Sequence, residues 1–306
     1  MGSFLDRIIY KSGVPDLLEV LANRLTPTDL QTLLLAVAEK RSARRTPASV
    51  LADYERSRFF GAPPVSRPAY LKWDAATVAA TEGRFEALTL SPMAPLASCS
   101  AVASVSQAWS VPTVRTGEVV SDPTNILALE AASRRKSGQA NVDLATTHRV
   151  VRPQSYSNSK MLAHFSMFAL LSTARDTGNS KTEAEAIGLH IGTHLSIFRA
   201  LFGGDIGLSA SYTVVSSGND DARLEALRRV ANQFGAEVWE EGDRPAVNAY
   251  YNGFCFHIWA ELEGRRQQLS DGGTVDWVGQ LIADAKERTL ISGAGVEGAL
   301  SLLLNR

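Results

Sequence analysis

Two arginines in the middle of the chain are the best-placed candidates for binding an anion. Arg149 and Arg152 lie close to the end of a predicted strand, in residues 147–154. A planar guanidinium offers paired N–H donors that match the oxygen atoms of a phosphate or a carboxylate. The two arginines therefore predict either an anion clamp or a structural salt bridge, and both interpretations stay open at this point.

The histidines form pairs that resemble part of a metal site. His190 and His194 are four residues apart, so on a helix both rings would lie on one face. The three residues between them include no Glu of the kind that serves zinc hydrolases as a base. Cys255 and His257 share one face of a predicted strand that is rich in aromatic residues. We predict that both pairs are structural and that the protein has no metal ligands.

The glycine-rich segment 293–298 has the spacing of a dinucleotide-binding turn. A Rossmann unit also needs an acidic residue about 20 positions downstream, and the sequence ends at Arg306. This segment is therefore predicted to be a tight connection between a strand and a helix. The sequence has no Gly-Lys-Ser/Thr phosphate loop and no Gly-x-Ser-x-Gly elbow, which argues against P-loop and α/β-hydrolase chemistry.

A mixture of helices and short strands must position these residues. Strands are predicted near 85–90, 118–120, 142–151 and 249–262, and helices near 126–135, 182–202 and 221–234. Ser180 and Glu183 have the spacing of a capping box, and residues 271–273, Asp-Gly-Gly, predict a turn. Strict alternation of strands and helices is absent. We therefore predict an α+β fold with a mainly antiparallel sheet flanked by helices.

The first 60 residues are predicted to form a small N-terminal helical region. Thr28 and Gln31 have capping-box spacing, and Thr46 precedes a proline that suits the first position of a helix. Several prolines predict a linker over residues 61–70. The expected domains are thus the helical region 1–60, the linker 61–70 and an α+β domain over 71–306.

Composition restricts the class of protein. The 306 residues are 45% hydrophobic and 21% charged, as in soluble globular proteins, and the net charge of −1 gives no global field for nucleic acid or an anionic membrane. The basic run 40–45 could contact RNA, but a solvated helix end explains it more simply. The two cysteines suit a reducing compartment. Since no secretory signal or membrane-spanning run is present, we expect a cytoplasmic protein with no membrane partner.

Taken in order, segments of residues 110–304 resemble the catalytic domain of class II aminoacyl-tRNA synthetases. The closest resemblance is to histidyl-tRNA synthetase and its paralogue, the regulatory subunit of ATP phosphoribosyltransferase. Residues 148–154 resemble motif 2, whose first arginine grips the ATP α-phosphate, and residues 293–298 resemble motif 3. Residues 120–125 stand where the family has a loop that contacts the amino acid. Residues 249–256 and 271–276 resemble a strand that lines the histidine pocket and a nearby Gly-Gly turn.

The resemblance implies roles for individual residues. The implied catalytic residues are Arg149 and Arg152; the nucleotide-binding residues are Arg149, Gly295 and Glu297; the substrate-binding residues are Asp122, Thr124, His164, Tyr250 and Tyr251. The resemblance also implies a homodimer, and ATP with Mg²⁺ as cofactors if the protein is catalytic.

Several positions depart from the family pattern. Gly298 replaces the motif 3 arginine that binds the γ-phosphate, and Val151 replaces the glutamate of motif 2. Phe165 and Ala169 stand where histidyl-tRNA synthetase has a Gln and a Glu, and Thr274 replaces an arginine. Each change removes a group aimed at charge that develops during adenylate formation. Because the sequence ends soon after motif 3, we also expect no anticodon-binding domain.

These departures favour a synthetase-like protein that binds a small amino-acid-like ligand, as a sensor or in support of a partner enzyme. The alternative is an ATP-dependent enzyme that adenylates an amino acid or another carboxylate for an acceptor other than tRNA. In that case Arg175 or Arg244 would substitute for the missing arginine. A third interpretation is an unrelated α+β protein in which the motif matches arose by chance.

Overall fold

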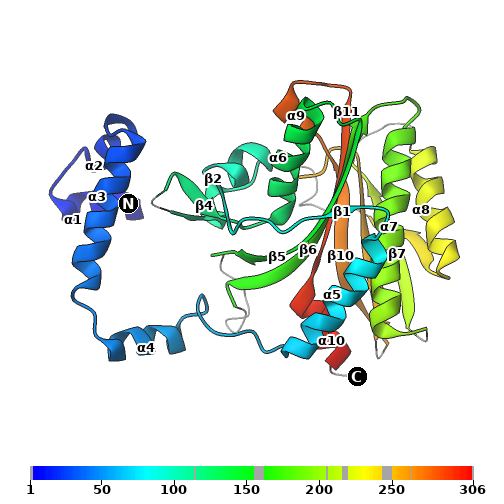
Figure 1. Ribbon diagram of the computed structural model, residues 1–306, viewed down its shortest axis with the longest axis horizontal. Helices are drawn as coiled ribbons and strands as arrows, with labels where there is room; N and C mark the ends of the chain where they lie inside the picture. Colours follow the sequence, from blue (N-terminus) through cyan, green and yellow to red (C-terminus); the bar gives the residue numbers. More distant parts are fainter. Residues whose placement is uncertain are drawn as a thin grey trace.

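The centre of the molecule is an eight-stranded sheet with the strand order β1-β5-β6-β11-β10-β9-β7-β8 (Figure 1). The computed structural model describes residues 3–113, 115–154, 162–204, 206–215, 220–242, 250–262 and 264–304. The pairs at the two edges of the sheet, β1 with β5 and β7 with β8, are parallel. The pairs between them are antiparallel. The predicted α+β fold with a mainly antiparallel sheet is confirmed.

The strands of this sheet are β1 (Glu86–Ala87), β5 (Asn141–Val151), β6 (His164–Arg175), β7 (Gly207–Val214), β8 (Glu237–Glu240), β9 (Phe254–Leu262), β10 (Arg265–Val275) and β11 (Glu287–Gly295). A small second sheet has the order β2-β4-β3 and is formed by β2 (Met93–Pro95), β3 (Val111–Pro112) and β4 (Gly117–Val119).

Helices cover both faces of the large sheet. One face packs against α5 (Arg67–Thr81), α7 (Lys181–Phe202) and α10 (Val296–Leu304), and α8 (Asp221–Gln233) packs on α7. The other face packs against α6 (Pro123–Lys136) and α9 (Trp277–Ile282). Each face of the sheet has its own hydrophobic core, and alternate side chains of β6 pack into one or the other. Phe168 and Leu170 lie on the α7 side, and Ala169 and Leu171 lie on the α6 side. No helix in the described parts of the chain is long and apolar enough to cross a membrane.

The N-terminal helices lie apart from the sheet (Figure 1). They are α1 (Phe4–Ser12), α2 (Leu17–Glu19) followed by a π-helical turn (Val20–Arg24), α3 (Pro27–Ser42) and α4 (Pro47–Arg56). None of these helices has a buried residue. Thr46 caps α4 as predicted, but Thr26 caps α3 in place of Thr28. Helix α5 begins at Arg67, inside the segment predicted as a linker. The division into domains itself stays a prediction.

Two local predictions were wrong for identifiable reasons. Ser180 is the N-cap residue of α7, but it adopts a left-handed conformation (φ 54°) and its side chain makes no capping bond, so the predicted box does not form. The predicted turn at 271–273 lies inside β10. A Cβ atom on Gly272 would lie 2.5 Å from the ring of Phe256, and one on Gly273 would lie 2.5 Å from the ring of Tyr251. The absence of a Cβ atom at these two glycines lets aromatic rings pack closely against the strand. Close packing within a strand is a common role of glycine besides its role in turns.

A chain of buried hydrogen bonds joins α7 to the sheet. His194 Nε2 and His190 Nδ1 contact Ser292 Oγ at 2.9 and 2.8 Å, and His190 Nε2 contacts Ser172 Oγ at 3.0 Å. Ser172 Oγ in turn donates to Asp143 Oδ1 at 2.5 Å. Burial lowers the pKa of both histidines, that of His194 to about 3. Both imidazoles are therefore neutral near pH 7, and their hydrogen bonds give them a structural role.

Candidate functional site

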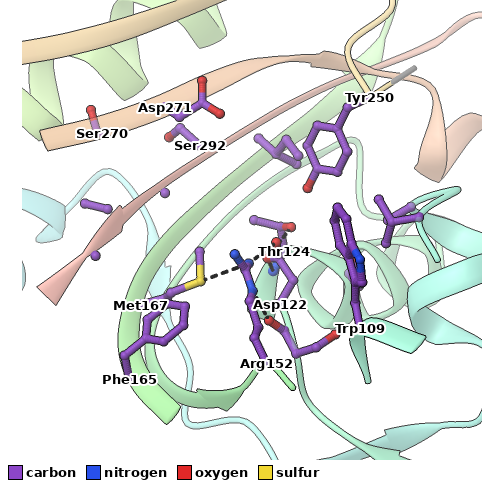
Figure 2. A pocket seen from close by; sticks show the side chains of 18 of the residues that line it. Trp109, Asp122, Thr124, Arg152, Phe165, Met167, Tyr250, Ser270, Asp271 and Ser292 are labelled. Carbon is purple, nitrogen blue, oxygen red and sulfur yellow. Dashed lines mark hydrogen bonds and ion pairs between the residues drawn. The ribbon is translucent and has the colours of Figure 1, made fainter. Parts of the chain in front are cut away.

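A cavity of about 450 Å³ lies on the α6 side of the sheet (Figure 2). Separate segments of the chain contribute its walls: the loop before α6, the start of β6, the middle of β10, the end of β11 and the residues before β9. The polar and aromatic lining residues include Trp109, Ser121, Asp122, Thr124, Asn125, Arg152, Phe165, Tyr250, Tyr251, Gln268, Ser270, Asp271 and Ser292. This volume and mixture suit a small polar molecule.

An arginine and a helix-capping aspartate form one wall of the cavity. Arg152 Nε donates to the backbone oxygen of Ser121 at 2.7 Å, and its Nη2 donates to Asp122 Oδ2 at 2.9 Å. Asp122 is the N-cap of α6: its Oδ1 accepts from the backbone N of Thr124 at 3.0 Å and from the Thr124 hydroxyl at 2.7 Å. Figure 2 shows these three side chains meeting at one wall. Asp122 therefore ties the position of Arg152 to the start of α6.

Replacing Asp122 with alanine is expected to lower the free energy of unfolding by about 2 kcal/mol, because it removes an N-cap and the partner of Arg152. Asp122→Asn keeps a good capping side chain but loses the charge, so its loss should be about half as large. Urea denaturation followed by circular dichroism measures both. Equal losses for the two variants would contradict the capping role of Asp122.

Two adjacent tyrosines form another wall. The rings of Tyr250 and Tyr251 meet edge to face, with centroids 4.9 Å apart, and Tyr250 also packs on the ring of Trp277. Burial raises the pKa of both phenols, so both stay protonated and able to donate a hydrogen bond. Tyr251 Oη donates to Asp271 Oδ2 at 2.9 Å. The wall is thus aromatic with hydroxyl groups at its surface.

A buried carboxylate holds the loop that faces the tyrosines. Glu118 in β4 is only 2% exposed and accepts from the backbone N of Cys99 at 2.9 Å, that of Ala97 at 3.0 Å and the Gln107 amide at 2.6 Å. These bonds fix a π-helical turn (Ser98–Val102) and a 3₁₀ turn (Gln107–Trp109). The second turn presents Trp109, which is 42% exposed, at the cavity.

Three of the residues implied by the resemblance lie outside the cavity. Arg149 Nη1 donates to Glu297 Oε1 at 3.1 Å, and Arg149 Nε contacts His164 Nδ1 at 3.1 Å. Glu297 also accepts from the Tyr70 hydroxyl and from the backbone N of Ser166. Arg149 is opposite Ser166 in the register of β5 with β6, whereas Phe165 and Met167, the neighbours of Ser166, line the cavity.

The implied site residues therefore divide between the two faces of the sheet. Arg152, Asp122, Thr124, Tyr250, Tyr251 and Gly295 come together around the cavity, and Arg149, His164 and Glu297 cluster on the opposite face. Arg175 pairs with Asp284 at the other end of β6, too far along the strand to replace the missing arginine. Arg244 lies outside the described residues. The catalytic and binding roles themselves stay predictions.

Sequence reasoning missed Asp271, His257 and Trp109 as neighbours of the site. The sequence predicts a turn at Asp271 and pairs His257 only with Cys255. The register of β9 with β10 places His257 directly opposite Asp271. A hairpin between two consecutive strands was the signal that could have revealed this pair.

The charged residues that line the cavity test whether it fits ATP, the cofactor that the resemblance implies. Among the described lining residues the charged ones are Arg152, Asp122 and Asp271. One arginine against two carboxylates is a poor electrostatic match for a triphosphate. The described lining therefore does not fit ATP. In the described parts of the chain no group of three or more His, Cys, Asp or Glu side chains is placed to hold a metal ion.

Comparison with solved structures shows a class II synthetase-like fold, which confirms the resemblance. The chain is similar to apo S. aureus histidyl-tRNA synthetase, with a TM-score of 0.59 and 11% identity, over 77% of this chain and 65% of that chain. It is also similar to an ATP phosphoribosyltransferase regulatory subunit/histidyl-tRNA synthetase from Bacillus halodurans C. The TM-score is 0.61 and the identity 13%, over 79% of this chain and 82% of that chain. A third similar structure is the RNA-binding domain of threonyl-tRNA synthetase from Cryptosporidium parvum Iowa II. It has a TM-score of 0.56 and 11% identity, over 83% of this chain and 70% of that chain.

At sequence identities of 11–13%, these structural similarities show the fold alone. The activity must be argued from the site. The chain spans less than two thirds of the S. aureus synthetase chain. No family model matches the sequence, and no curated protein matches it.

Proposed function

We propose that this protein is a synthetase-like paralogue that binds a small amino-acid-like ligand in the cavity and acts as a sensor or as the support of a partner enzyme. One observation carries the proposal: Arg152, Tyr250 and Tyr251 line a cavity of amino-acid size, while Gly298 provides no charge where the family has a phosphate-binding arginine. The site thus retains groups that suit the amino acid and lacks one that suits the triphosphate.

The ligand carboxylate would bind to Arg152. The contacts of this arginine with the described residues use Nε and Nη2, so Nη1 can donate to a ligand oxygen. Asp122 holds the guanidinium in place, which reduces the entropy lost when the ligand binds. The protonated Tyr250 and Tyr251 supply hydroxyl groups, and Trp109 supplies an apolar surface for the ligand side chain.

The proposal includes a homodimer, as the resemblance implies. Leu71 and Val78 lie exposed on α5 and offer apolar surface that a second subunit would cover. The alternative function is an ATP-dependent enzyme, with Mg²⁺, that adenylates an amino acid or another carboxylate for an acceptor other than tRNA. Arg152 in the cavity is the feature that this alternative would use.

Two assays on the same protein test the proposal. Isothermal titration calorimetry with each standard amino acid measures binding, and amino-acid-dependent ATP–pyrophosphate exchange measures adenylation. We expect binding of one group of amino acids without exchange. Arg152→Gln should weaken that binding at least about tenfold, because a charge-assisted hydrogen bond is lost. Arg266→Gln is the matched control, since Arg266 pairs with Glu237 on the surface.

The outcomes separate the two functions. Exchange above background with one amino acid or carboxylate would establish the adenylating enzyme instead. Absence of binding by every amino acid, with protein shown to be folded, would contradict both a ligand-sensing role and the assignment of Arg152.

A further inference from the structure

A second cavity, of about 620 Å³, lies at the end of the sheet where β10 ends and β11 begins. Segments from the start of α7, from α8 and from α9 with the residues that follow it form its walls. The charged residues in the described lining of this α9 cavity are Glu183, Arg223, Asp276, Asp284, Glu287 and Arg288. The cavity of the proposed function lies at the other end of β11, and Figure 1 shows α9 and α10 at these two ends.

Glu183, near the start of α7, is a buried carboxylate that lines the α9 cavity. Only 7% of the residue is exposed. Its Oε1 lies 3.2 Å from Arg223 Nη2 and 3.5 Å from Arg288 Nε, whereas its Oε2 is buried without a hydrogen-bond partner among the described residues. Arg223 Nε is also buried and unpaired there. Because unpaired buried polar atoms are costly, a polar ligand at this corner of the cavity would relieve that cost.

The charges around this corner indicate a cationic ligand. Arg223 also pairs with Asp220 at 2.8 Å, and Arg288 pairs with Asp176 at 2.7 Å. Together with Glu183 these residues form a cluster of three carboxylates and two guanidiniums, so one negative charge is in excess. A cationic nitrogen can donate to Glu183 Oε2, and a water molecule that it keeps bound can accept from Arg223 Nε.

Asp276 supplies a second negative charge in excess. It directly precedes α9 and is exposed, its Oδ2 accepts from Gln280 Nε2 at 2.8 Å, and no described cation forms an ion pair with it. The other acidic lining residues have arginine partners, in the pairs Asp284–Arg175 and Glu287–Arg135. The described lining therefore has two unbalanced negative charges, one at the Glu183 cluster and one at Asp276.

The size of the α9 cavity favours an organic ligand over a metal ion. A volume of about 620 Å³ accommodates a small organic molecule. Within the described ranges no group of three or more His, Cys, Asp or Glu side chains is placed to hold a metal ion. Two separate carboxylates suit two cationic nitrogens that are joined by an alkyl chain.

We propose that the α9 cavity binds a small aliphatic diamine, with one ammonium group at Glu183 and the other at Asp276. Glu183 binds through its unpaired Oε2, and Asp276 offers Oδ1, the oxygen that does not accept from Gln280. Each ammonium group has N–H donors and forms a charge-assisted hydrogen bond. The inference goes beyond the proposed function and does not depend on it, since no described residue lines both cavities.

The experiment compares diamines with monoamines of the same chain length. The probes are diaminopropane with propylamine, putrescine with butylamine, and cadaverine with pentylamine. Isothermal titration calorimetry on the full chain at low salt measures the affinity for each probe. We expect at least one diamine to bind about tenfold or more tightly than its monoamine, because it forms a second charge-assisted hydrogen bond. The pair with the largest ratio shows which chain length spans the two carboxylates.

Two variants assign the ammonium groups to the residues. Asp276→Asn keeps the size of an exposed side chain and should reduce the ratio to near one, while the affinity for the monoamine stays unchanged. Glu183→Gln should weaken the binding of both members of the pair at least about tenfold. Circular dichroism checks that each variant is folded, and Asp276→Asn by itself tests the inference if Glu183→Gln does not fold.

Glu185→Gln is the matched control. Glu185 lies on the same helix as Glu183, its side chain is 69% exposed, and it pairs with Lys181 at 3.9 Å. It lines a smaller cavity that Glu183 also lines, and it does not line the α9 cavity. The affinities of Glu185→Gln for all six probes should therefore equal those of the wild type.

Several results would overturn the inference. Equal affinities within every pair, or no binding of any probe to the folded wild type, would show that the α9 cavity does not bind a diamine. A ratio that survives Asp276→Asn would show that Asp276 does not bind the second ammonium group. Equal losses in Glu183→Gln and Glu185→Gln would show a nonspecific attraction of cations to acidic residues. In each case the proposed function, which concerns the other cavity, would stand.

Discussion

Gly273→Ala is expected to lower the free energy of unfolding by about 3 kcal/mol, because the added methyl group has no space in the core. Its Cβ would lie 2.5 Å from Cδ1 of Tyr251 and 2.7 Å from the backbone oxygen of Phe254. The side chain of Tyr251 could move aside, but the backbone oxygen cannot without disturbing β9. Urea denaturation followed by circular dichroism measures the loss.

Gly298→Ala is the matched control for this substitution. Gly298 lies in α10, and a Cβ atom there would meet nothing within 4 Å. Since alanine is a better helix former than glycine, the control should be unchanged or more stable by about 0.5–1 kcal/mol. Similar losses in the two variants would show that the close packing around Gly273 is not the cause. Displacement of Tyr251 in Gly273→Ala should also weaken the proposed ligand binding, since Tyr251 lines the cavity.

Acidification is expected to destabilise the protein steeply between pH 6.5 and pH 5. Burial lowers the pKa of His190 and His194 in the folded state, that of His194 to about 3, whereas an exposed histidine has a pKa of about 6.5. Between these values the unfolded chain binds protons that the folded chain does not. The free energy of unfolding therefore falls as pH falls, by up to about 1.4 kcal/mol per pH unit for each histidine.

Thermal unfolding at a series of pH values measures this slope. The variant His194→Gln keeps a donor for Ser292 and removes one titrating group, so it should lose about half of the slope that the pair contributes. Burial raises the pKa of Asp143, which works in the opposite direction, so the effect of His194 is taken from the difference in slope between His194→Gln and the wild type. An unchanged slope in His194→Gln would contradict the assignment of the effect to this residue.

The elements that follow local rules could be predicted from the sequence. Helices α6 and α7 and strand β5 lie close to the predicted ranges because hydrophobic periodicity and flanking residues mark them. The order of degenerate motifs indicated the class II synthetase-like fold. Six implied site residues line one cavity because the fold brings together the separate segments in which they lie.

Contacts set by strand pairing could not be predicted in the same way. Arg149 and Arg152 were both candidates for one anion site, but the register of β5 with β6 directs Arg149 to the opposite face. The glycines of β10 resembled a turn because their local signal is the same whether the chain bends or a ring packs against it. Asp271 and His257 meet only because β9 and β10 pair at that register.

Alternate side chains of strand β6 lie on opposite faces of the sheet. Phe165 and Met167 line the cavity, while Ser166 and Phe168 contact the Glu297 cluster and the core under α7. An insertion or deletion of one residue near its start would exchange these two sets and damage both sides at once. Homologues and engineered forms of this protein should therefore vary in length at the loop between β6 and α7, where Gly178 has open space around it, and keep β6 at constant length.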